Sequence, residues 1–499
     1  MVKPVRGDLL AGVSVALVLV PQALAYAEIA GVDPVYGLYA AVAAPIAGAF
    51  VGSSPYLQTG PVAVTSLLTF GALSSLGEPF TARFALLAGL LAILVGLIRL
   101  VIGLVGAGPV AYLMSQPVVV SFTSAGAALI ISSQIPSLLG TEGGSGNPVL
   151  TALRAIASPG EWSLTDVAVG VGAMAIMLGG RRISGLFPGA LVAVVAGSLW
   201  SWATDYDGSV VGDIEVELVV RTDLPWGDLP VLLLPALVIA IVGFAEPSAI
   251  ARRYAAEDRT YWDSNREFIG QGLANLASGV AGGYPVGGSF SRTALNRMGG
   301  ARTRWSGAFT GLAVAALLPV AFLLAPLPKA VLAGLVIAAV YPLIDVRSPA
   351  LYWRWSRPQF VVGVVTAVGT LVLAPRVDQG VLLGVGTALA VHLWRELKVG
   401  VPSRLDGDTL HVWPTGVLYF GSAPGVERSV TQLIAQHTEV QRIVVHLGRL
   451  GRVDLTGALM LRDVLDEVRA AGVGVELTGA KGHAAKLLSR VLEDDSLLE

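Results

Sequence analysis

The sequence contains no cysteine among its 499 residues. Disulfides, thiolate metal sites and cysteine nucleophiles are therefore excluded. Charged residues are also scarce, at 14%, whereas soluble domains carry about 25%. The formal net charge is only -2, which argues against a nucleic-acid-binding protein. With 54% hydrophobic residues, the composition predicts that most of the chain lies in a lipid bilayer.

No signature of catalysis or of a bound metal is visible in the sequence. The apolar part of the chain contains no nucleophile–base pair. The spacing typical of zinc ligands is also missing among the histidines of the C-terminal part, which are His411, His437, His446 and His483. We interpret these histidines as structural or surface residues. We therefore expect no enzymatic activity, no cofactor and no metal ion.

Apolar runs follow one another along most of the chain and fall into two sets of seven. The first set lies at about Asp8–Ile29, Tyr36–Val51, Gly60–Leu76, Thr81–Leu104, Gln116–Leu138, Ser163–Gly180 and Leu186–Trp202. The second set lies at about Leu229–Tyr254, Phe268–Gly282, Ser289–Arg297, Trp305–Leu324, Lys329–Leu343, Phe360–Leu373 and Val381–Leu397. The third run of each set is short. Hydropathy thus predicts an α-helical membrane protein with about fourteen transmembrane segments, in which an odd number per set inserts the second set upside down.

Each short run follows or contains a polar stretch that a spanning helix normally avoids. The first stretch is Tyr56–Thr65 (YLQTGPVAVT) and the second is Gly282–Asn296 (GGYPVGGSFSRTALN). Both contain Gly and Pro, which break continuous helices. Such breaks are tolerated at membrane depth where the freed backbone lines a cavity or is buried in protein. Paired interrupted segments indicate the binding site of a secondary transporter, so we expect two half-helix N-termini that face one another near the bilayer midplane.

The second break carries the features of an anion site. Ser289 or Ser291 is suited to cap a short helix, whose first N–H groups and positive dipole end then point into the cavity. Arg292 adds a full positive charge. Taken alone, these residues also fit a cytoplasmic loop with an ordinary surface arginine. In the first run, Gln22 and Tyr26 share a helix face toward the protein interior, where Gln22 either contacts a substrate or makes an interhelical hydrogen bond.

Several motifs resemble the sulfate permease (SulP) family of anion transporters. They are Pro21–Tyr26 (PQALAY), Pro34–Ala41 (PVYGLYAA) with Gly52–Ser54 after it, Thr59–Val64 (TGPVAV) and Ser289–Arg292 (SFSR). The pattern departs from that of the family at Pro55, where a basic residue is usual, and at Gly48, where an aromatic or branched residue is usual. The resemblance extends over essentially the whole chain. It implies a UraA-like fold of two inverted seven-segment repeats with interrupted segments 3 and 10.

We predict one substrate site that is formed by the two breaks and the first helix. Its residues are Gln22, Tyr26, Thr59, Gly60, Pro61, Val62, Gly288, Ser289, Phe290, Ser291 and Arg292. Tyr26, Val62 and Phe290 would form its apolar walls. One arginine and two opposed helix dipoles supply between about one and two positive equivalents, which suits chloride, bicarbonate, sulfate or a dicarboxylate. Animal relatives often have Phe where this chain has Val62, so a smaller wall there would admit a larger organic anion.

Glu246 is an ionisable residue in the middle of an apolar run. An intramembrane carboxylate is costly and is a functional candidate by default. In related proteins this segment flanks the anion site and contributes coupling groups, and some sodium-coupled members use an aspartate and a hydroxyl. Here Ser248 is the only hydroxyl nearby, so we favour protons over sodium and assign proton coupling to Glu246. A structural salt bridge to Arg292 is the alternative, and a pair that substrate binding breaks would itself serve coupling.

The distribution of basic residues predicts the orientation in the membrane. They cluster on one side of the fourteen-segment arrangement, at Lys3/Arg6, Arg181/Arg182, Arg252/Arg253/Arg259, Arg297/Arg302/Arg304, Arg347/Arg354/Arg357 and Arg395/Lys398. The loop Thr204–Asp228 falls on the other side and is acidic, with Asp205, Asp207, Asp213, Glu215 and Glu217. Positive charge marks the cytoplasmic side. We expect a multi-pass protein of the cytoplasmic (inner) membrane with both termini in the cytoplasm.

After about Lys398 charged residues become frequent, and β-like runs alternate with amphipathic helical runs. We predict a transmembrane domain over 1–398, with repeats at about 8–203 and 229–397, and a cytoplasmic α/β domain over 399–499. The latter is similar to the STAS domain of SulP transporters, whose helix-start motif matches Asp454-Leu455-Thr456-Gly457 with Asp454 as N-cap. Leu455 replaces the serine that is phosphorylated in related anti-sigma antagonists. Thr456 is a weak candidate for modification, and a scaffold for dimerisation and trafficking is the better interpretation.

These observations predict a secondary transporter that moves a small anion, most directly by proton-coupled symport of a dicarboxylate, sulfate, bicarbonate or similar anion. The resemblance implies a homodimer, and the C-terminal domain is a candidate for an unidentified cytosolic partner. An uncoupled anion channel or exchanger on the same fold is the first alternative. A nucleobase:cation symporter shares the architecture but generally places carboxylates in segments 8 and 10, whereas this chain has Arg292 in segment 10.

Overall fold

The computed structural model describes residues 3–112, 115–144, 146–183, 187–214, 216, 223–397 and 400–492. The chain divides into two compact units, Met1–Thr387 and Ala388–Glu499. The division falls within α16 (Val377–Glu396). The boundary near Lys398 and the acidic residues Glu215 and Glu217 lie outside the described ranges. The predicted domain limits therefore stay a prediction.

The first unit is built from helices. Its first half contains α1 (Arg6–Ala30), α2 (Pro34–Ala49), α3 (Ala63–Leu73), α4 (Ala82–Leu104), α5 (Gln116–Leu139), α6 (Pro148–Ala157), α7 (Leu164–Ile183) and α8 (Gly189–Ala203). Its second half contains α9 (Leu229–Glu257), α10 (Ser264–Val280), α11 (Phe290–Met298), α12 (Trp305–Leu317), α13 (Lys329–Val340), α14 (Arg347–Trp355), α15 (Arg357–Val372) and α16. Each of the fourteen apolar runs overlaps one of these helices, and the short third runs correspond to α3 and α11.

Two helices, α6 and α14, lie between the predicted runs. Both begin at local capping signals: Oδ1 of Asn147 accepts from the N–H of Val149 at 2.9 Å, and Oδ1 of Asp345 accepts from the N–H of Arg347 at 2.9 Å. α6 is apolar but only ten residues long, and α14 contains Arg347 and Arg354, so neither gives an apolar run long enough to span a bilayer. Within the described residues, seven helical stretches are long and apolar enough to span a bilayer, and the predicted total of fourteen spans stays a prediction.

α4 and α10 pack against each other almost backbone to backbone. A Cβ at Gly96 would lie 2.7 Å from the backbone nitrogen of Leu276, and a Cβ at Gly279 would lie 2.5 Å from the carbonyl oxygen of Gly89. Neither position can hold a side chain without moving a helix. Small residues allow such close approach between membrane helices, where packing rather than a hydrophobic driving force holds helices together. This pair supports the segments that contain the two breaks.

The two polar breaks meet inside the first unit. β1 (Thr59–Gly60) pairs antiparallel with β2 (Gly287–Gly288), with Thr59 opposite Gly288 and Gly60 opposite Gly287. Each strand is followed shortly by a short helix, α3 after β1 and α11 after β2. Two inverted strand–half-helix units produce this antiparallel pairing. The structure thus confirms that the interrupted segments lie side by side.

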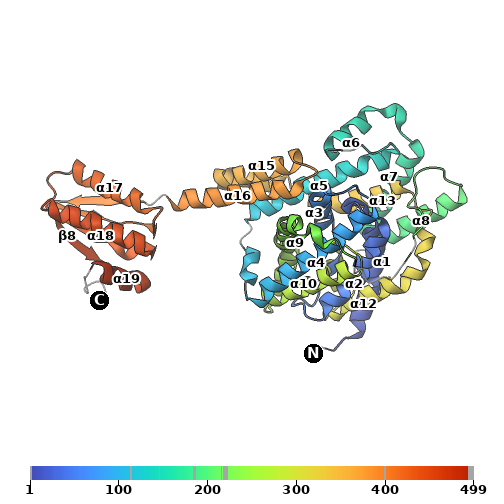
Figure 1. Ribbon diagram of the computed structural model, residues 1–499, viewed down its shortest axis with the longest axis horizontal. Coiled ribbons are helices and arrows are strands. Elements are labelled where there is room, and N and C mark those ends of the chain that lie inside the picture. Colours follow the sequence, from blue (N-terminus) through green and yellow to red (C-terminus); the bar gives the residue numbers. More distant parts are fainter. Residues whose placement is uncertain are drawn as a thin grey trace. The chain divides into compact units, whose positions relative to one another are not determined.

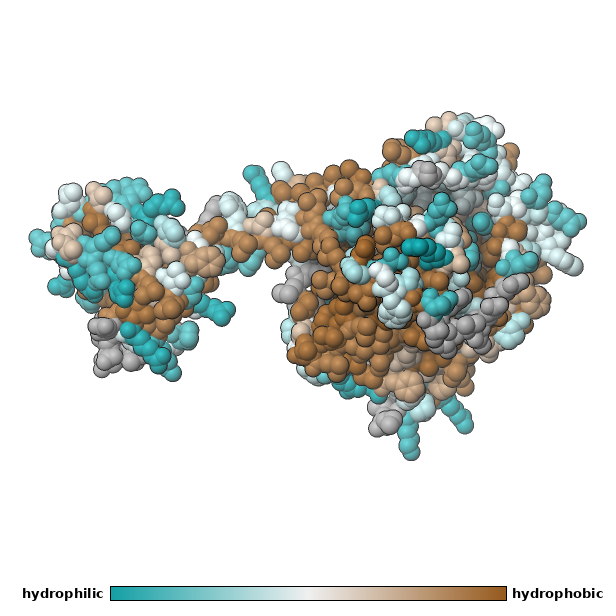
Figure 2. Space-filling view, viewed as in Figure 1, coloured by the Kyte–Doolittle hydropathy of each residue, from teal (hydrophilic) through white to brown (hydrophobic). Residues whose placement is uncertain are grey.

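The helices of the first unit pack together into a thick bundle (Figure 1). α1 contacts α2, α3, α11 and α12, whereas α5 contacts α7, α13 and α15. Apolar side chains cover much of the surface of the first unit in Figure 2. Leu104, Val105 and Trp202 are each at least 70% exposed. An apolar exterior of this extent suits a protein that is embedded in lipid.

The second unit is an α/β domain. Its four-stranded sheet has the order β3 (Ser403–Asp406), β4 (Thr409–Val412), β6 (Arg442–His446) and β8 (Gly474–Thr478), in which only the β3–β4 pair is antiparallel. β5 (Gly416–Leu418) and β7 (Leu450–Val453) form a separate parallel pair, and the helices are α17 (Ala423–Gln436), α18 (Leu455–Ala470) and α19 (Gly482–Leu492). Oδ1 of Asp454 accepts from the N–H of Gly457 at 2.7 Å, which confirms the predicted N-cap. The sequence predicts β-like runs at Thr409–Trp413, Val417–Phe420, Arg442–Leu447 and Val473–Leu477, which correspond to β4, β5, β6 and β8 and leave β3 and β7 unpredicted.

Two of the histidines are neighbours on the sheet of the second unit. Nδ1 of His411 lies 3.0 Å from Nε2 of His446, and Oγ1 of Thr478 lies 2.9 Å from Nδ1 of His446. The ring of Trp413 stacks on His446, with centroids 4.8 Å apart and planes at 7°. Burial, together with the adjacent His411, lowers the pKa of His446, and Glu476 opposes this effect. Sequence spacing gives no sign that the two residues meet, and their structural role stays a prediction.

We expect acidification to destabilise the sheet of the second unit. Because the folded state lowers the pKa of His446, the unfolded state binds more protons below the ordinary histidine pKa of about 6.5, and stability rises with pH in that window. The contribution of neutral His446 to the free energy of unfolding is fully present above about pH 6.5. It decreases as the pH falls toward the pKa that His446 has in the folded state. Hydrogen exchange of β6 peptides in the full-length protein, corrected for intrinsic rates, measures this change.

The matched control is a histidine that lies on α19. His446→Gln is expected to remove the pH dependence of β6 protection, whereas His483→Gln is expected to keep it. Equal protection of β6 in the unmutated protein on both sides of about pH 6.5 would contradict the prediction.

Candidate functional site

Arg292 lies in the first turn of α11 and is almost completely buried, with 1% of its surface exposed. Its Nη1 donates to Oε1 of Gln22 at 3.0 Å. Its Nε and Nη2 are buried and have no hydrogen-bond partner in the described part of the chain. Nη2 faces Gly60, where a Cβ would lie 3.6 Å away. The alternative of an ordinary surface arginine is therefore wrong, and a bound anion would offset the desolvation of the two unsatisfied nitrogens.

α1 places Gln22 and Tyr26 on one face, and both side chains are buried. Because arginine can only donate, the amide oxygen of Gln22 is committed to Arg292 and its NH₂ group is the end that can donate to an anion. The two residues line a cavity of about 10 Å³, which has room for about one water. The other walls are apolar side chains of α7, α8 and α13: Met177, Ala190, Leu335, Val336 and Ala339. The structure thus shows the interhelical hydrogen bond of Gln22, and its contact with a substrate stays a prediction.

The N-termini of α3 and α11 supply backbone donors and positive dipole ends. Oγ of Ser289 caps α11 and accepts from the N–H of Arg292 at 3.4 Å, as predicted. Oγ of Ser291 lies 3.3 Å from Oγ of Ser289. α3 begins at Ala63, directly after Val62 in an extended conformation. The first N–H groups of a helix have no partner within the helix, so both ends favour an anion.

The paired strands are held in place by two amide side chains of α10. Nε2 of Gln271 donates to Oγ1 of Thr59 at 2.7 Å. Asn275 binds both polar groups of the Val286 backbone: its Oδ1 accepts from the N–H at 2.9 Å, and its Nδ2 donates to the carbonyl at 3.2 Å. A Cβ at Gly288 would lie 2.7 Å from Cδ1 of Leu57 and 3.2 Å from Cγ of Pro247, so a larger residue there would have to displace these side chains. Thr59 and Gly288 therefore help to fix the geometry of the paired strands β1 and β2.

The apolar walls are only partly as predicted. Tyr26 and Val62 are buried, with 7% and 6% of their surfaces exposed, and Pro61 is buried beside them. Cγ2 of Val62 lies 3.0 Å from the position of a Cβ at Gly287, so Val62 packs against β2. Phe290 is 39% exposed and encloses the site less than expected. Phe290 is the first residue of α11, directly after the N-cap Ser289.

Glu246 lies on α9 beside the start of α11. Its Oε1 accepts from the N–H of Phe290 at 3.4 Å. No ion pair joins Glu246 to Arg292 within the described residues, and the salt-bridge alternative is therefore wrong. The carboxylate lies at the positive end of α11, which is the end predicted to attract the substrate. The carboxylate of Glu246 and an anion at the start of α11 would therefore be attracted by the same positive potential, that of the N-terminus of α11.

Comparison with known proteins identifies the family. The profile of the sulfate permease family matches residues 5–366, and the profile of the STAS domain matches residues 403–497. The chain belongs to the sulfate permease family. Its matched relatives are transporters, so the expectation that it is not an enzyme is confirmed.

Three relatives show the extent of the similarity. A probable sulfate transporter of Mycobacterium tuberculosis is 35% identical, over 98% of this chain and 93% of its own. A bovine sodium-independent sulfate anion transporter is 28% identical, over 96% of this chain and 85% of its own. The murine anion transporter Slc26a9 in the inward-facing state has the same fold, with a TM-score of 0.89 at 20% identity over 99% of this chain and 89% of its own. The predicted membrane fold with a C-terminal STAS domain is thus confirmed.

Sequence reasoning missed three kinds of residue at this site in the sulfate permease fold. Gln271 and Asn275 are amides one turn apart in an apolar run, a pattern that indicates polar contacts inside a membrane protein. Tyr284 is completely buried within electrostatic reach of Arg292. Arg99 is a completely buried cation in the middle of α4. A charged residue within a long apolar run is the signal that could have found it.

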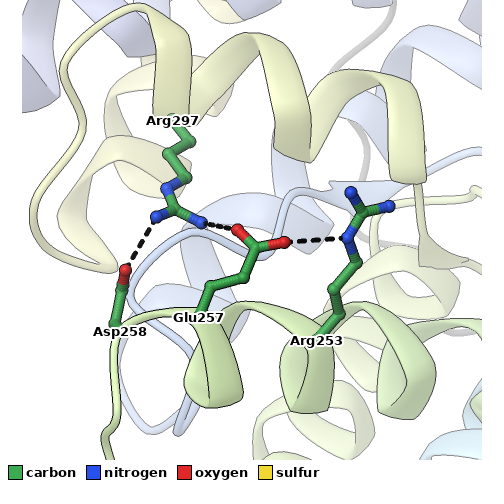
Figure 3. Close-up of polar contacts among 4 residues, drawn as sticks. All are labelled: Arg253, Glu257, Asp258 and Arg297. Carbon is green, nitrogen blue, oxygen red and sulfur yellow. Dashed lines mark hydrogen bonds and ion pairs between the residues drawn. The ribbon is translucent and has the colours of Figure 1, made fainter.

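A network of ion pairs joins the C-terminal ends of α9 and α11 (Figure 3). Arg297 lies between two carboxylates: its Nη1 is 2.5 Å from Oε2 of Glu257, and its Nη2 is 2.7 Å from Oδ1 of Asp258. Arg253 binds the other oxygen of Glu257 at 3.0 Å. The guanidinium of Arg297 also lies over two rings, Tyr254 at 4.8 Å and Tyr56 at 5.3 Å. The half-helix that carries Arg292 is thus anchored at its far end.

We expect Arg297→Ala to lower the free energy of unfolding by about 1–2 kcal/mol, because two partly exposed ion pairs and two cation–π contacts are lost together. Arg297→Lys should recover only part of this, since an ammonium cannot bind two carboxylates as a fork or stack on rings. Arg253→Ala is the matched control, and because this side chain is 66% exposed its loss should lower stability much less. Thermal unfolding of the purified protein measures all three, and equal losses for Arg297→Ala and Arg253→Ala would contradict the assignment.

Proposed function

We propose that the protein is a proton-coupled secondary transporter of a small divalent anion, a dicarboxylate or sulfate, across the cytoplasmic membrane. The observation that carries this proposal is the buried guanidinium of Arg292, whose Nε and Nη2 have no partner among the described residues. Native proteins rarely leave two such donors unsatisfied. An anion at Arg292 would receive a charge-assisted pair of hydrogen bonds.

The proposed anion lies between Arg292 and the starts of the two half-helices. The further donors that we assign to this anion are the NH₂ group of Gln22, the first N–H groups of α3 and the hydroxyl of Ser289. Gly60 allows close approach, because the space beside Nη2 holds no side chain from that residue. Such a site offers its anion only a few hydrogen-bond donors and one full positive charge. Its affinity is therefore moderate, and the anion can also be released.

Glu246 supports the coupling to protons. Its carboxylate accepts from the N–H of Phe290 and lies in the same positive field as the anion. An anion that enters beside an ionised Glu246 is repelled, and a proton on Glu246 removes this repulsion. Proton and anion then bind together and leave together. Sodium is the less favoured coupling ion, because Ser248 is the only serine or threonine of α9, the helix that carries Glu246.

The relatives guide the choice of substrate. Two of them have names that refer to sulfate, and one is described as sodium-independent. Sulfate and dicarboxylates share a double negative charge, and the small side chain of Val62 would leave room for a carbon chain. We further propose that the chain forms a homodimer in the cytoplasmic membrane, with both termini and the STAS domain in the cytoplasm, where an unidentified partner can bind the latter.

The decisive experiment uses full-length protein in proteoliposomes with a pH dye trapped inside. Labelled chloride, bicarbonate, sulfate, succinate and fumarate are offered one at a time, and uptake and lumenal pH are followed together. Uptake of sulfate or a dicarboxylate with acidification of the lumen is the expected result. Uptake without acidification would replace symport by the alternative, an anion exchanger or channel. No uptake of any of the five anions would overturn the proposal.

A further inference from the structure

Arg99 is a second buried cation close to the anion site. It lies on α4 with none of its surface exposed. Arg99 and Arg292 are the two largest side chains that are fully buried in the described part of the chain. A buried arginine normally pairs with a carboxylate, because an unpaired charge is expensive away from water.

All the recorded partners of Arg99 are backbone carbonyl oxygens. Its Nε donates to Ala240 at 3.1 Å, its Nη2 donates to Ile239 at 3.1 Å, and its Nη1 donates to Val286 at 3.1 Å. No carboxylate within the described residues forms an ion pair with it. Carbonyl groups satisfy its N–H donors, but they carry no net charge. The positive charge of Arg99 therefore remains uncompensated inside the protein.

The guanidinium of Arg99 lies close to the place where the two breaks pair as β1 and β2. Val286, which it binds, immediately precedes β2. A Cβ at Gly243 would lie 2.8 Å from Nη2 of Arg99 and 3.1 Å from Cγ2 of Thr65, which belongs to the first turn of α3. The same Cγ2 lies 3.5 Å from the position of a Cβ at Gly287 in β2. Arg99 is thus close to the N-terminus of α3 and to the strand that leads into α11.

We propose that Arg99 is the second fixed charge of the anion site and sets its preference for divalent over monovalent anions. This inference rests on the proposed function. Arg99 does not touch the anion; it acts through its field, which is weakly screened in a buried region. A divalent anion beside Arg292 compensates both cations at once, whereas a monovalent anion leaves one charge uncompensated. The field of a fixed charge stabilises a bound anion in proportion to the charge of that anion.

This proportionality gives a result that a purely structural role would not produce. When the field of Arg99 is removed, the loss of binding free energy for sulfate is twice the loss of binding free energy for chloride. If Arg99→Gln weakens chloride binding about tenfold, it should weaken sulfate binding about a hundredfold. The ratio of the two affinities is measured within one protein sample, so it does not depend on how much of the sample is folded.

The test measures equilibrium binding of labelled sulfate to the full-length protein in proteoliposomes, and its displacement by chloride. Arg99→Gln should lower the preference for sulfate about tenfold, and Arg99→Lys, which retains the charge, should restore most of it. Arg99→Met repeats the neutral substitution if Arg99→Gln does not accumulate. Arg83→Gln is the matched control on α4, because this arginine is 66% exposed and pairs with Asp228, and its preference should equal that of the unmutated protein.

The outcomes separate this inference from the proposed function. An unchanged sulfate preference in the neutral variants, or an equal loss in Arg99→Lys, would overturn the role of Arg99 while the Arg292 site stands. If Arg292→Ala binds sulfate and chloride as the unmutated protein does, the proposed anion site itself is wrong.

Discussion

Replacing Arg292 with alanine is expected to reduce the uptake of every anion by at least about a hundredfold. Arg292 supplies the positive side-chain charge of the proposed site. The substitution removes this charge together with the hydrogen bond to Gln22. Truncating one partner of a buried charge pair typically costs about 2–5 kcal/mol, and about 2.7 kcal/mol corresponds to a factor of a hundred. Initial rates of labelled sulfate, succinate and chloride uptake in proteoliposomes measure the effect.

Two further variants show whether the loss is specific. Arg292→Lys retains the charge but cannot present two donors in a plane, so it should transport at an intermediate rate. Arg302→Ala removes an exposed arginine a few residues along the chain and should transport normally. Retained transport of every anion by Arg292→Ala, at normal abundance, would show that the substrate binds elsewhere.

Glu246→Gln is expected to abolish proton coupling. Glutamine can still accept from the N–H of Phe290, so the start of α11 keeps its hydrogen bond, but the side chain no longer carries a proton or a charge. In the unmutated protein one coupled proton allows about tenfold accumulation of the anion per unit of pH difference, since each unit is worth about 1.4 kcal/mol. In the variant this accumulation should vanish, and anion uptake should no longer acidify the lumen.

The matched control for this prediction lies on the same helix. Glu257→Gln removes a carboxylate of α9 that belongs to the ion-pair network with Arg297, and it should lower stability while leaving acidification intact. Acidification that persists unchanged in Glu246→Gln would remove this residue from the coupling mechanism. Acidification absent already in the unmutated protein would favour an exchanger or a channel.

Much of the fold and part of the site could be predicted from local sequence patterns. Apolar runs predicted the helices of the first unit, because lipid requires continuous apolar segments whose backbone groups are satisfied internally. Ser289 was recognised as a helix cap because capping depends on a few adjacent residues. The similar patterns of the two breaks predicted that these segments act together, whereas the pairing of Thr59 with Gly288 in a short two-stranded sheet was not predicted. The roles of these residues in substrate binding stay predictions.

Other parts of the site depend on contacts that no local pattern records. Arg99 is on α4, and its partners Ala240 and Val286 are far away in the sequence. His411 and His446 meet only because β4 and β6 are adjacent in the sheet. α6 and α14 were not predicted because neither gives an apolar run long enough to be recognised as a membrane segment.

The sequence by itself determined that this is a membrane protein with two interrupted segments, a C-terminal α/β domain and the motifs of the sulfate permease family. These features follow from composition, periodicity and short motifs, which act over a few neighbouring residues. The tertiary structure alone decided that Arg292 is buried with two unsatisfied nitrogens, that Glu246 binds the start of α11 instead of Arg292, and that Arg99 lies uncompensated behind the site. Burial and charge compensation are properties of the packed chain, because they depend on which distant segments exclude water together.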